Sequence, residues 1–510
     1  MRLIWILGDQ LLPSHPLLAS PEPDLLVGMI ESAPRATHLR YHQQKLTLLY
    51  SAMRHYVADL KKRKFHTLYH HLSDSPIGAD YSTVLDGWIQ EYRIREIHLL
   101  DPNEYDTLHA LPTLSKKLGV PIQTHRSPQF LVSREEFFAW AKGKKHLLME
   151  AHYRRLRAEH NILMTPTGKP EGGDWNLDDQ NRRTAREFSK ENPKIPPLPK
   201  ISQDPTTAAV AKEVTQRFPD HPGKGDDLWI PTTRQGALEW LKGFIRQRLE
   251  AFGSWEDVMI ENQPVLFHSV LSPFLNLGLL TPMECIQAAE KAYRDGKAPL
   301  NSVEGFIRQI LGWREFIHGI YWLKMPAYRE ENFLGADRPL PRWAYTGKTE
   351  MRCVSEAIRG TLDLAYNHHI QRLMVLGNYF LLGGYEPKAV LRWYTEMYLD
   401  AYDWVMIPNV LGMILFADGG FFATKPYAAG AAYQDKMGNH CASCRFDPKK
   451  KEGPDACPFH SLYWNFFGQH GPKFSSNPRI GMMLTMWEKK PAEEKKRIRA
   501  DAQNFLQAQA

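Results

Sequence analysis

The chain has 510 residues, enough for two or three domains, and its 43% hydrophobic and 24% charged content is typical of globular proteins. It has no apolar run of about 18 residues that could span a membrane, and its N-terminal apolar run is too short for a signal peptide, so we expect a cytoplasmic protein with reduced thiols. The formal charge of +7 is compatible with nucleic-acid binding but not diagnostic of it.

Strands and helices alternate over the first third of the chain. Short apolar runs predict strands at residues 3–7, 25–30, 67–72, 96–100 and 121–125. Apolar side chains at helical spacing predict a helix over 46–60, and another is expected over 83–92. Strands separated by helices form a parallel sheet with helices on its faces, so we expect an α/β, Rossmann-like domain over residues 1–135.

Polar residues follow several of these predicted strands. Gly8, Asp9 and Gln10 follow the first strand, Glu31 follows the second, and an Asp-Pro-Asn-Glu stretch at 101–104 follows the fourth. Ligands of parallel sheets lie beyond the carboxyl ends of the strands, so a ligand is expected there. There is no G-x-G-x-x-G motif, which disfavours the usual dinucleotide clamp.

Residues 136–235 are predicted to join two domains. A basic helix is expected over 142–157; its charges form either a solvated face or a phosphate-facing surface. Residues 165–234 are rich in Pro, Gly, Asp and Asn and predict a long loop. A loop of this length is usually functional or disordered, and its Trp175, Arg182, Arg183 and Arg186 favour a function.

From residue 236 to 510 the sequence predicts helices and connecting loops. Helical periodicity is found over 237–249, 282–293, 303–323, 354–367, 370–382, 387–404 and 491–507. We therefore expect a large all-α domain.

Four of the five cysteines are spaced like ligands. Cys441 and Cys444 form a C-x-x-C, Cys457 precedes a proline, and Cys353 lies far upstream. Four thiolates suit an iron–sulfur cluster or a tetrahedral zinc, although a zinc ribbon normally has two C-x-x-C knuckles. Four unrelated buried thiols are the remaining alternative, and Cys285, on an expected helix, fits that description.

Five short stretches in the second half of the chain and the linker carry a family resemblance. They are LSPFLNLG at 271–278, GFIRQILGWREF at 305–316, HHIQRLM at 368–374, DAYDW at 400–404 and GGDWN at 172–176. Their order and spacing resemble the photolyase/cryptochrome flavoproteins. With the four cysteines, the resemblance narrows to the bacterial iron–sulfur branch, the prokaryotic (6-4) photolyases and related cryptochromes.

The resemblance implies three cofactors. FAD would lie in the helical domain, a 4Fe–4S cluster on Cys353, Cys441, Cys444 and Cys457, and a 6,7-dimethyl-8-ribityllumazine antenna in the α/β domain. The antenna candidates are Gly8, Asp9, Gln10, Glu31, His42 and Lys45. The FAD candidates are His268, Ser269, Leu271, Ser272, Glu304, Arg372, Asp400 and Asp403.

Two roles near the flavin are less well defined by the resemblance. Counting six residues from Asp400 to the expected partner of flavin N5 gives Met406, where the family usually has Asn, so Asn409 is the other candidate. Trp393 and Tyr394 match electron-transfer residues. The outer donor would be Tyr345, with Trp343 two residues before it.

The resemblance also implies a reaction and a substrate. Reversing a (6-4) photoproduct returns a hydroxyl or amine from one base to the other, which needs a proton, and histidine is the side chain suited to supply it. His368 and His369 occupy the catalytic position, while Asp257, Arg182, Arg183 and Tyr427 are candidate contacts to UV-damaged DNA. We therefore expect a monomeric, light-driven DNA repair enzyme. A bacterial blue-light photoreceptor and an iron–sulfur nucleic-acid-binding module are the alternatives.

Overall fold

The computed structural model describes residues 1–74, 80–475 and 477–509. It begins with a parallel five-stranded sheet in the order β3-β2-β1-β4-β5. The strands are β1 (Arg2–Trp5), β2 (Leu25–Ile30), β3 (His66–His70), β4 (Glu96–Leu100) and β5 (Ile122–His125). All five predicted strands are present, and the bounds of the second and fourth are those predicted.

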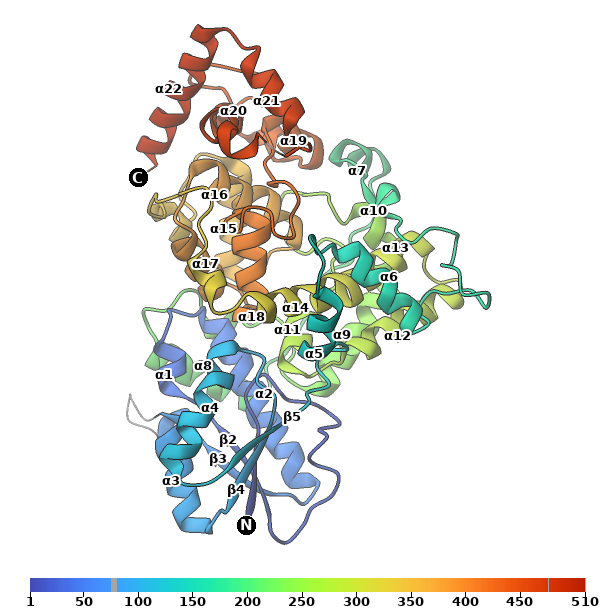
Figure 1. Cartoon of the computed structure of the whole chain (residues 1–510), viewed down its shortest axis with the longest axis vertical. Coiled ribbons are helices and arrows are strands. Elements are labelled where there is room, and N and C mark those ends of the chain that lie inside the picture. The colour runs from blue at the N-terminus through green and yellow to red at the C-terminus, as the bar shows by residue number, and fades with distance from the viewer. Residues whose placement is uncertain (75–79, 476, 510) are drawn as a thin grey trace.

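Helices cover both faces of the sheet (Figure 1). Leu3 and Trp5 of β1 pack against α3 (Tyr81–Tyr92) and α4 (Tyr105–Leu118), whereas Ile4 packs against α2 (Gln43–Lys62) on the other face. A short α1 (Ala33–Thr37) follows β2. This alternation is the two-residue period of a strand that is buried on both sides.

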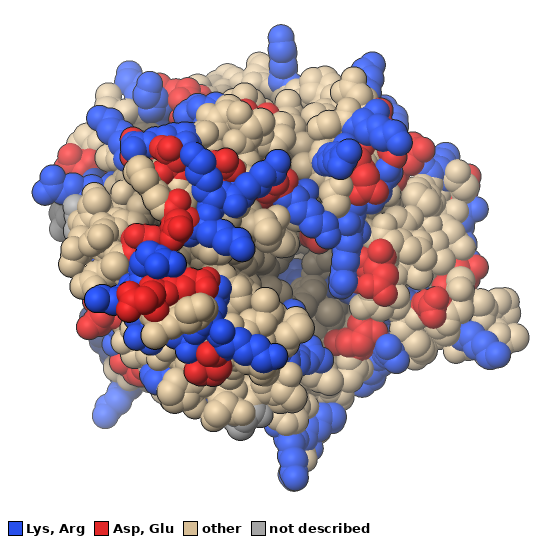
Figure 2. All heavy atoms as spheres, turned by 90° about the horizontal axis from the view of Figure 1, so that it is seen from above, with Lys and Arg blue, Asp and Glu red and all other residues tan. Residues whose placement is uncertain are grey.

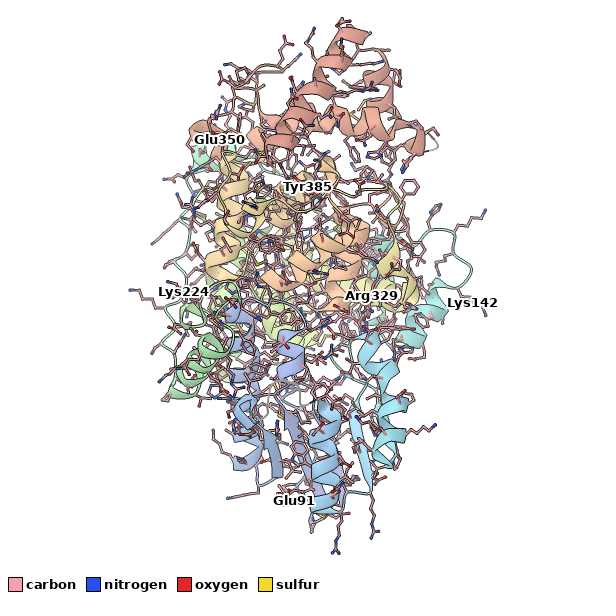
Figure 3. All side chains as sticks on the ribbon, turned by 90° about the vertical axis from the view of Figure 1, so that its left-hand side faces the viewer. Glu91, Lys142, Lys224, Arg329, Glu350 and Tyr385 are labelled. Carbon is pink, nitrogen blue, oxygen red and sulfur yellow. The ribbon has the colours of Figure 1, made fainter. Side chains whose placement is uncertain are left out.

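The segment between the sheet and the large helical region differs from prediction. In place of one basic helix from 142, α5 (Arg134–Ala141) ends early and α6 (Met149–Glu159) begins after a loop that carries Lys142 (Figure 3). The predicted long loop contains α7 (Ala185–Glu191) and α8 (Pro205–Arg217). Each begins at a side-chain cap that composition alone concealed, Thr184 with Glu187 for α7 and Asp204 for α8.

The remainder of the chain is helical, as predicted. Its helices are α9 (Arg234–Gln247), α10 (Leu249–Trp255), α11 (Ser272–Leu277), α12 (Pro282–Arg294), α13 (Leu300–Ile307), α14 (Glu315–Lys324), α15 (Arg352–Leu364), α16 (Asn378–Gly383), α17 (Pro387–Met397), α18 (Asp403–Ile407), α19 (Ala431–Met437), α20 (Pro458–His470), α21 (Gly481–Glu488) and α22 (Ala492–Ala508). Three π-helices, Arg308–Arg314, Gln371–Gly377 and Pro408–Ile414, adjoin α14, α16 and α18. π-helices are often found at functional sites.

The predicted helix over 387–404 is interrupted in the structure. α17 ends at Met397, and the chain turns before α18 begins at Asp403. Other segments satisfy the peptide groups of this turn: Leu399 donates to the carbonyl of Ala365 at 3.0 Å, and the Ala401 carbonyl accepts from Lys45 at 2.6 Å. Aromatic residues at helical spacing continue across this turn, so the sequence pattern predicts one unbroken helix.

One hydrophobic core joins the α2 face of the sheet to the helical region. In Figure 1 the sheet lies at one end of the molecule, with α20–α22 at the other. Within the described residues, no helix combines the length and apolar character needed to cross a bilayer. The domain boundaries at 135 and 235 stay predictions.

His152 on α6 offers a test of the helical core. Both of its ring nitrogens are buried without a hydrogen-bond partner between Phe137 and Trp140, and burial, helped by the charge of Arg155, lowers its pKa to about 3. The folded protein therefore keeps this ring neutral. The unfolded chain takes up a proton below pH about 6.5, so stability falls from there towards pH 3.

We expect His152→Phe to raise the free energy of unfolding, by about 2 kcal/mol at pH 5 and less at pH 8. Urea unfolding at the two pH values measures this difference. Replacement of the exposed His109 by Phe is the control and should leave the pH dependence unchanged. An equal gain at both pH values would show that proton uptake by this histidine in the unfolded chain does not lower the stability at pH 5.

Candidate functional site

A buried ion pair forms the centre of the helical region. Arg372, in the π-helix before α16, donates from Nη1 to Oδ1 of Asp400 at 2.9 Å. Ser272 donates to Oδ2 of the same carboxylate at 2.6 Å, and the Arg372 Nε donates to the carbonyl of Asn367 at 2.8 Å. Burial alone would raise the pKa of Asp400, but the Arg372 charge and these hydrogen bonds hold it below its usual value.

Aromatic rings surround the Arg372 guanidinium. It lies 4.0 Å from the ring centre of Tyr398 and 5.2 Å from that of Tyr366, and the Tyr394 hydroxyl donates to the Arg372 carbonyl at 2.7 Å. These contacts fix the cation in one orientation. Both members of the predicted pair, Arg372 and Asp400, are therefore held in place by neighbouring side chains.

The predicted histidines lie together. The rings of His268 and His368 are stacked with centres 4.5 Å apart, and His268 Nε2 lies 3.0 Å from the carbonyl of Glu256. His368 is fully buried, yet neither of its ring nitrogens has a protein partner within the described chain. His369 has protein around it on most sides, and its side chain is exposed to solvent.

All three rings are neutral near pH 7. Burial, together with the Arg372 charge and neighbouring histidines, lowers the pKa of His268 to about 3 and that of His368 well below its ordinary value. Burial and Arg372 lower the pKa of His369 to about 4. Each ring therefore offers one N–H donor and one acceptor nitrogen.

The remaining predicted residues of the flavin region differ from one another in their contacts. Ser269 accepts from Trp240 Nε1 through its backbone carbonyl at 2.9 Å, and Leu271 precedes α11 in the buried core. Glu304 is buried and accepts from the Tyr153 hydroxyl at 2.9 Å and from Arg308 at 3.1 Å. Asn409 donates to the Val405 carbonyl of the adjoining α18 at 2.8 Å, and Met406 is buried.

Asp403 lies on the other side of this region, where the helical and α/β parts meet. It forms an ion pair of 2.7 Å with Arg329, which also pairs with Asp106 of α4 at 2.8 Å (Figure 3). Its backbone N–H donates to Glu104 at 3.2 Å. The contacts of Asp403 therefore join the helical part to the α/β part, three residues after Asp400 in the chain.

Residues predicted to meet DNA form a charged group at the edge of the helical region. Asp257 lies near Asp178, Arg182 and Arg308, and burial together with the Asp178 charge raises its pKa to about 6. Tyr427 is near Asp178 as well. The predicted Asp257, Arg182 and Tyr427 are thus brought together, although they lie about 245 residues apart at the extremes.

Arg183 and Arg186 differ in their surroundings. Arg183 covers the ring of Trp255 at 4.1 Å and pairs with Glu191, so it braces α7. Arg186 is exposed. On the face that carries the C-terminal helices, Lys and Arg gather around a hollow near the centre (Figure 2), which suits a polyanion.

The antenna candidates divide into two groups. Asp9 and Lys45 lie with Glu104, Arg35 and Tyr41 at the carboxyl end of the sheet. Burial and the charge of Asp403 raise the pKa of Glu104 to about 7, while burial lowers that of Lys45 to about 8.

The other candidates, like Asp9 and Lys45, also have protein partners. Gln10 donates to the Asp101 carbonyl at 2.9 Å, and Glu31 is held by Arg54 at 2.7 Å and Tyr69 at 2.6 Å. His42 begins α2, with Nε2 2.9 Å from the Leu362 carbonyl. A Cβ on Gly8 would come within 3.0 Å of Leu49 and Met53, so this glycine allows α2 to approach the sheet.

Sequence reasoning missed Arg35, Tyr41, Asp178 and Glu256. Glu256 is buried beside Asp257, and burial raises its pKa to about 8. Arg35 and Tyr41 follow β2 at the expected edge of the sheet, a signal that could have found them. Asp178 has no comparable signal, because only the fold brings it to Asp257.

The predicted electron-transfer residues lie in an aromatic cluster. The Trp393 and Tyr394 ring centres are 5.1 Å apart, and Trp393 donates from Nε1 to the Ala344 carbonyl at 2.9 Å. Tyr345, the next residue, is 41% exposed, as an outer donor requires. Trp343 is buried 4.9 Å from Tyr379, so it lies deeper than Tyr345.

The four predicted cysteine ligands are brought together. Cys353 lies in the first turn of α15, and Cys457 is the N-cap residue of α20. Burial, followed by the charges of Cys457, Cys441 and Cys444, raises the pKa of the Cys353 thiol well above its usual value, so the four sulfurs lie within electrostatic reach. Cys285 is buried on α12, apart from them.

In the part of the chain that the structure describes, no three Cys, His, Asp or Glu side chains are close enough to hold a single metal ion. A tetrahedral zinc places its ligand sulfurs about 3.8 Å apart, from Zn–S bonds of about 2.3 Å. A cubane cluster binds each thiolate to a different iron and holds them farther apart.

Comparison with known proteins places the chain in a family. A (6-4) photolyase of Agrobacterium fabrum (strain C58) is 40% identical over 509 residues, which cover 99% of both chains. The chain belongs to the photolyase family. The family model for deoxyribodipyrimidine photo-lyase-related proteins matches residues 4–229 of the chain. An uncharacterized protein of Acanthamoeba polyphaga mimivirus is 37% identical over 116 residues, 23% of the chain and 85% of that protein.

A solved structure supports the fold. The crystal structure of a bacterial class III photolyase from Agrobacterium tumefaciens matches 99% of this chain and 98% of its own, with a TM-score of 0.55 at 15% identity. Both the motif resemblance and the α/β plus all-α fold class are confirmed.

Membership of the family makes FAD the cofactor of this photolyase. The residues present fit that group. Arg372 supplies a fixed cation, Ser272 a hydroxyl, and His368 two buried nitrogens that lack protein partners. Unpartnered buried polar atoms beside a buried cation are typical of a pocket whose partner is a ligand.

We expect Asp400→Ala to destabilise the photolyase by about 3–5 kcal/mol, because it leaves the Arg372 cation buried without its carboxylate. It should also release FAD. The double change Arg372→Met with Asp400→Ala should recover most of the stability but not the flavin. Urea unfolding and the flavin absorbance of purified protein measure the two effects.

The matched control is Lys388→Ala, which breaks the exposed pair with Glu330. It should cost less than about 1 kcal/mol and leave FAD bound. Full retention of FAD by Asp400→Ala would remove the pair from the cofactor site.

Proposed function

We propose that the protein is a light-driven lyase that repairs (6-4) pyrimidine photoproducts in UV-damaged DNA. The observation that carries the proposal is the histidine pair beside the Arg372–Asp400 site in a chain related over its full length to a (6-4) photolyase. His368 is buried without a protein partner and His369 faces solvent within the fold. Such a pair can meet a base that has entered from outside.

Reduced FAD, when bound, supplies the light-driven electron to the lesion. The residues around it then have separate tasks. Arg372, fixed by Asp400 and by the Tyr398 ring, provides positive charge next to the site. Ser272 orients the carboxylate so that its second oxygen is also satisfied.

The proton is assigned to His369. Its pKa of about 4 leaves it neutral before the lesion receives negative charge. An anion nearby favours the charged imidazolium, so His369, which is exposed to solvent, takes up a proton from water when the lesion is reduced and passes it to the migrating group. His368 positions the pair by stacking on His268, whose Nε2 is tied to the Glu256 carbonyl.

A damaged base must leave the duplex to reach this site. We assign the entry to the hollow in the basic face of Figure 2. Asp257, Arg182 and Tyr427 would contact the lesion or its strand, with Arg186 available to a phosphate and Arg183 bracing the same segment.

Three further assignments complete the proposal. Cys353, Cys441, Cys444 and Cys457 hold a 4Fe–4S cluster. The lumazine antenna lies at the carboxyl end of the sheet, where Asp9, Lys45, Glu104, Arg35 and Tyr41 provide charges and a ring. Electrons for flavin reduction enter through Tyr345, Trp393 and Tyr394.

The cellular setting follows from the chemistry. Thiolate ligands of the cluster require a reducing compartment, so we place the protein in the cytoplasm. The proposed reaction uses residues of one chain alone, so we expect a monomer.

Repair should depend on His369 and not on Trp393 once the flavin is reduced. We expect His369→Ala to bind FAD and lesion DNA but to lose about 100-fold or more in repair yield, because no group protonates the migrating substituent. Trp393→Phe should slow photoreduction yet repair normally after chemical reduction. Both are measured by illuminating reduced protein with an oligonucleotide that carries one (6-4) lesion.

Near wild-type repair by His369→Ala would remove the histidine from the proton step. Absence of repair by the unchanged protein, with FAD bound and photoreducible, would favour the photoreceptor function.

Replacement of one cluster ligand should remove the iron. We expect Cys457→Ala to lose the iron of about four atoms per chain and much of the soluble yield, because the cluster joins segments far apart in sequence. Cys285→Ala, a buried thiol outside the quartet, is the control and should keep the iron. Iron analysis of anaerobically purified protein measures both, and zinc in its place would overturn the assignment.

A further inference from the structure

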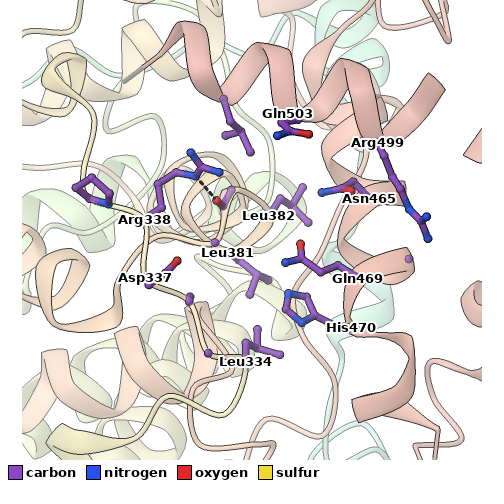
Figure 4. Close-up of a pocket in the computed structure, with 17 residues that line it drawn as sticks. Leu334, Asp337, Arg338, Leu381, Leu382, Asn465, Gln469, His470, Arg499 and Gln503 are labelled. Atoms are coloured by element: carbon purple, nitrogen blue, oxygen red, sulfur yellow. Dashed lines mark hydrogen bonds between the residues drawn. The ribbon is translucent and has the colours of Figure 1, made fainter. Parts of the chain in front are cut away.

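A cavity of about 740 Å³ lies on the side of the helical region (Figure 4). Its walls are the loop at residues 334–339, the end of α16, and the facing sides of α20 and α22. None of the residues assigned to the flavin, cluster, antenna or DNA lines it. Its volume is in the range of small-molecule sites.

Two arginines make the cavity positive. Arg338 is fixed by its Nε, which donates to the Gly383 carbonyl at 3.0 Å, and by its backbone N–H, which donates to Gly384 at 3.1 Å. Within the described chain its Nη atoms have no hydrogen-bond or ion-pair partner. Arg499 of α22 lies 5.6 Å from the Trp487 ring and is likewise without a carboxylate among the described residues.

Side-chain amides without partners line the walls formed by α20 and α22. The amides of Asn465 and Gln469 of α20 and of Gln503 of α22 form no hydrogen bond to any described part of the protein. His470 is 9% exposed, and its ring also has no hydrogen-bond partner there. Burial and the Lys473 charge lower the pKa of His470 to about 4, so its ring is neutral and offers both a donor and an acceptor.

Apolar side chains and glycine backbone form the remaining surface. Leu334, Leu381, Leu382 and Leu506 reach the cavity, and Gly384 and Gly468 leave it open to the backbone. A flat ring can lie against such a surface. Side-chain amides present a donor and an acceptor side by side, which match the edge of a nucleobase.

We propose that this cavity binds a nucleoside monophosphate. The base lies against the leucines, with its edge on the amides of Asn465, Gln469 and Gln503. The phosphate lies against Arg499, because a guanidinium group binds phosphate with paired, charge-assisted hydrogen bonds, and Arg338 on the facing side of the cavity (Figure 4) adds positive charge. Asp337 is the one carboxylate among the lining residues that the structure describes, so the positive charge prevails.

The nucleotide can be free in solution or part of a DNA strand. The two sources share one chemistry, and competition separates them. The probe is radiolabelled dAMP in equilibrium dialysis against the full chain with its FAD. Deoxyadenosine, inorganic phosphate and an undamaged oligo(dA) serve as unlabelled competitors.

We expect dAMP to bind and Arg499→Ala to weaken it about tenfold, the loss of one charge-assisted hydrogen bond. Gln503→Ala should weaken it less. Arg497→Ala is the matched control, because Arg497 lies on the same helix but pairs with Glu452 outside the cavity. Displacement by oligo(dA) would identify a strand nucleotide as a source, and failure to displace would identify the free nucleotide.

Two results would overturn the proposal. One is the absence of dAMP binding by the unchanged protein. The other is equal binding by the unchanged protein, Arg499→Ala and Gln503→Ala, which would place dAMP elsewhere. Competition by inorganic phosphate as strong as that by dAMP would overturn the assignment of the base. All the substitutions lie on exposed positions of α22, so folding is checked by flavin content.

Discussion

The buried ammonium of Lys45 ties the sheet to the catalytic region. From α2 it donates to the carbonyls of Thr395 at 3.1 Å and Ala401 at 2.6 Å, on either side of the turn that carries Asp400. This turn is where the chain leaves α17, and its peptide groups would otherwise be buried without partners. The ion pair with Arg372, and with it the cofactor site, therefore depends on a side chain from the other part of the protein.

Charge in this junction is balanced locally. Lys45 is near Glu104, Asp400, Asp403 and Glu396, and these carboxylates partly offset the burial that lowers its pKa. Burial and the charge of Asp403, in turn, raise the pKa of Glu104. A cluster of this kind costs free energy unless each group is paired, so the two parts of the molecule stabilise each other only when they are docked.

Much of the fold was predictable from local patterns. The buried strands read as apolar runs, and 25–30 and 96–100 were predicted at their true bounds. The prediction failed where a single residue changes the path of the chain: at Met397, where aromatic periodicity continued past the end of the helix, and at Asp204, where a cap begins a helix inside a polar segment. The π-helices had no sequence signal, because periodicity does not reveal a shift in hydrogen-bond register.

The candidate site was predictable to the extent that it lies in motifs. Arg372, Asp400 and the histidines lie in short stretches with a characteristic order, and the structure brings them into contact. Asp178 and Arg338 lie outside these motifs. Each acts through a neighbour more than 40 residues away in the chain, Asp257 for the first and Gly383 for the second, and only the folded backbone sets those pairs.

The three π-helices have a consequence for comparing this chain with its relatives. A π-helix holds one residue more per turn than the α-helix it replaces, so the side chains after it are rotated relative to those before it. The π-helix at residues 408–414 contains Asn409 and begins two residues after Met406, the two candidates for the flavin N5 partner. A relative that lacks the extra residue would keep the same spatial wall with a numbering shifted by one. Residues of this chain and of a relative that lie beyond such a segment are therefore equivalent when they touch the same atoms, whatever their numbers. Insertion of a single residue there changes the local register and does not disrupt the fold.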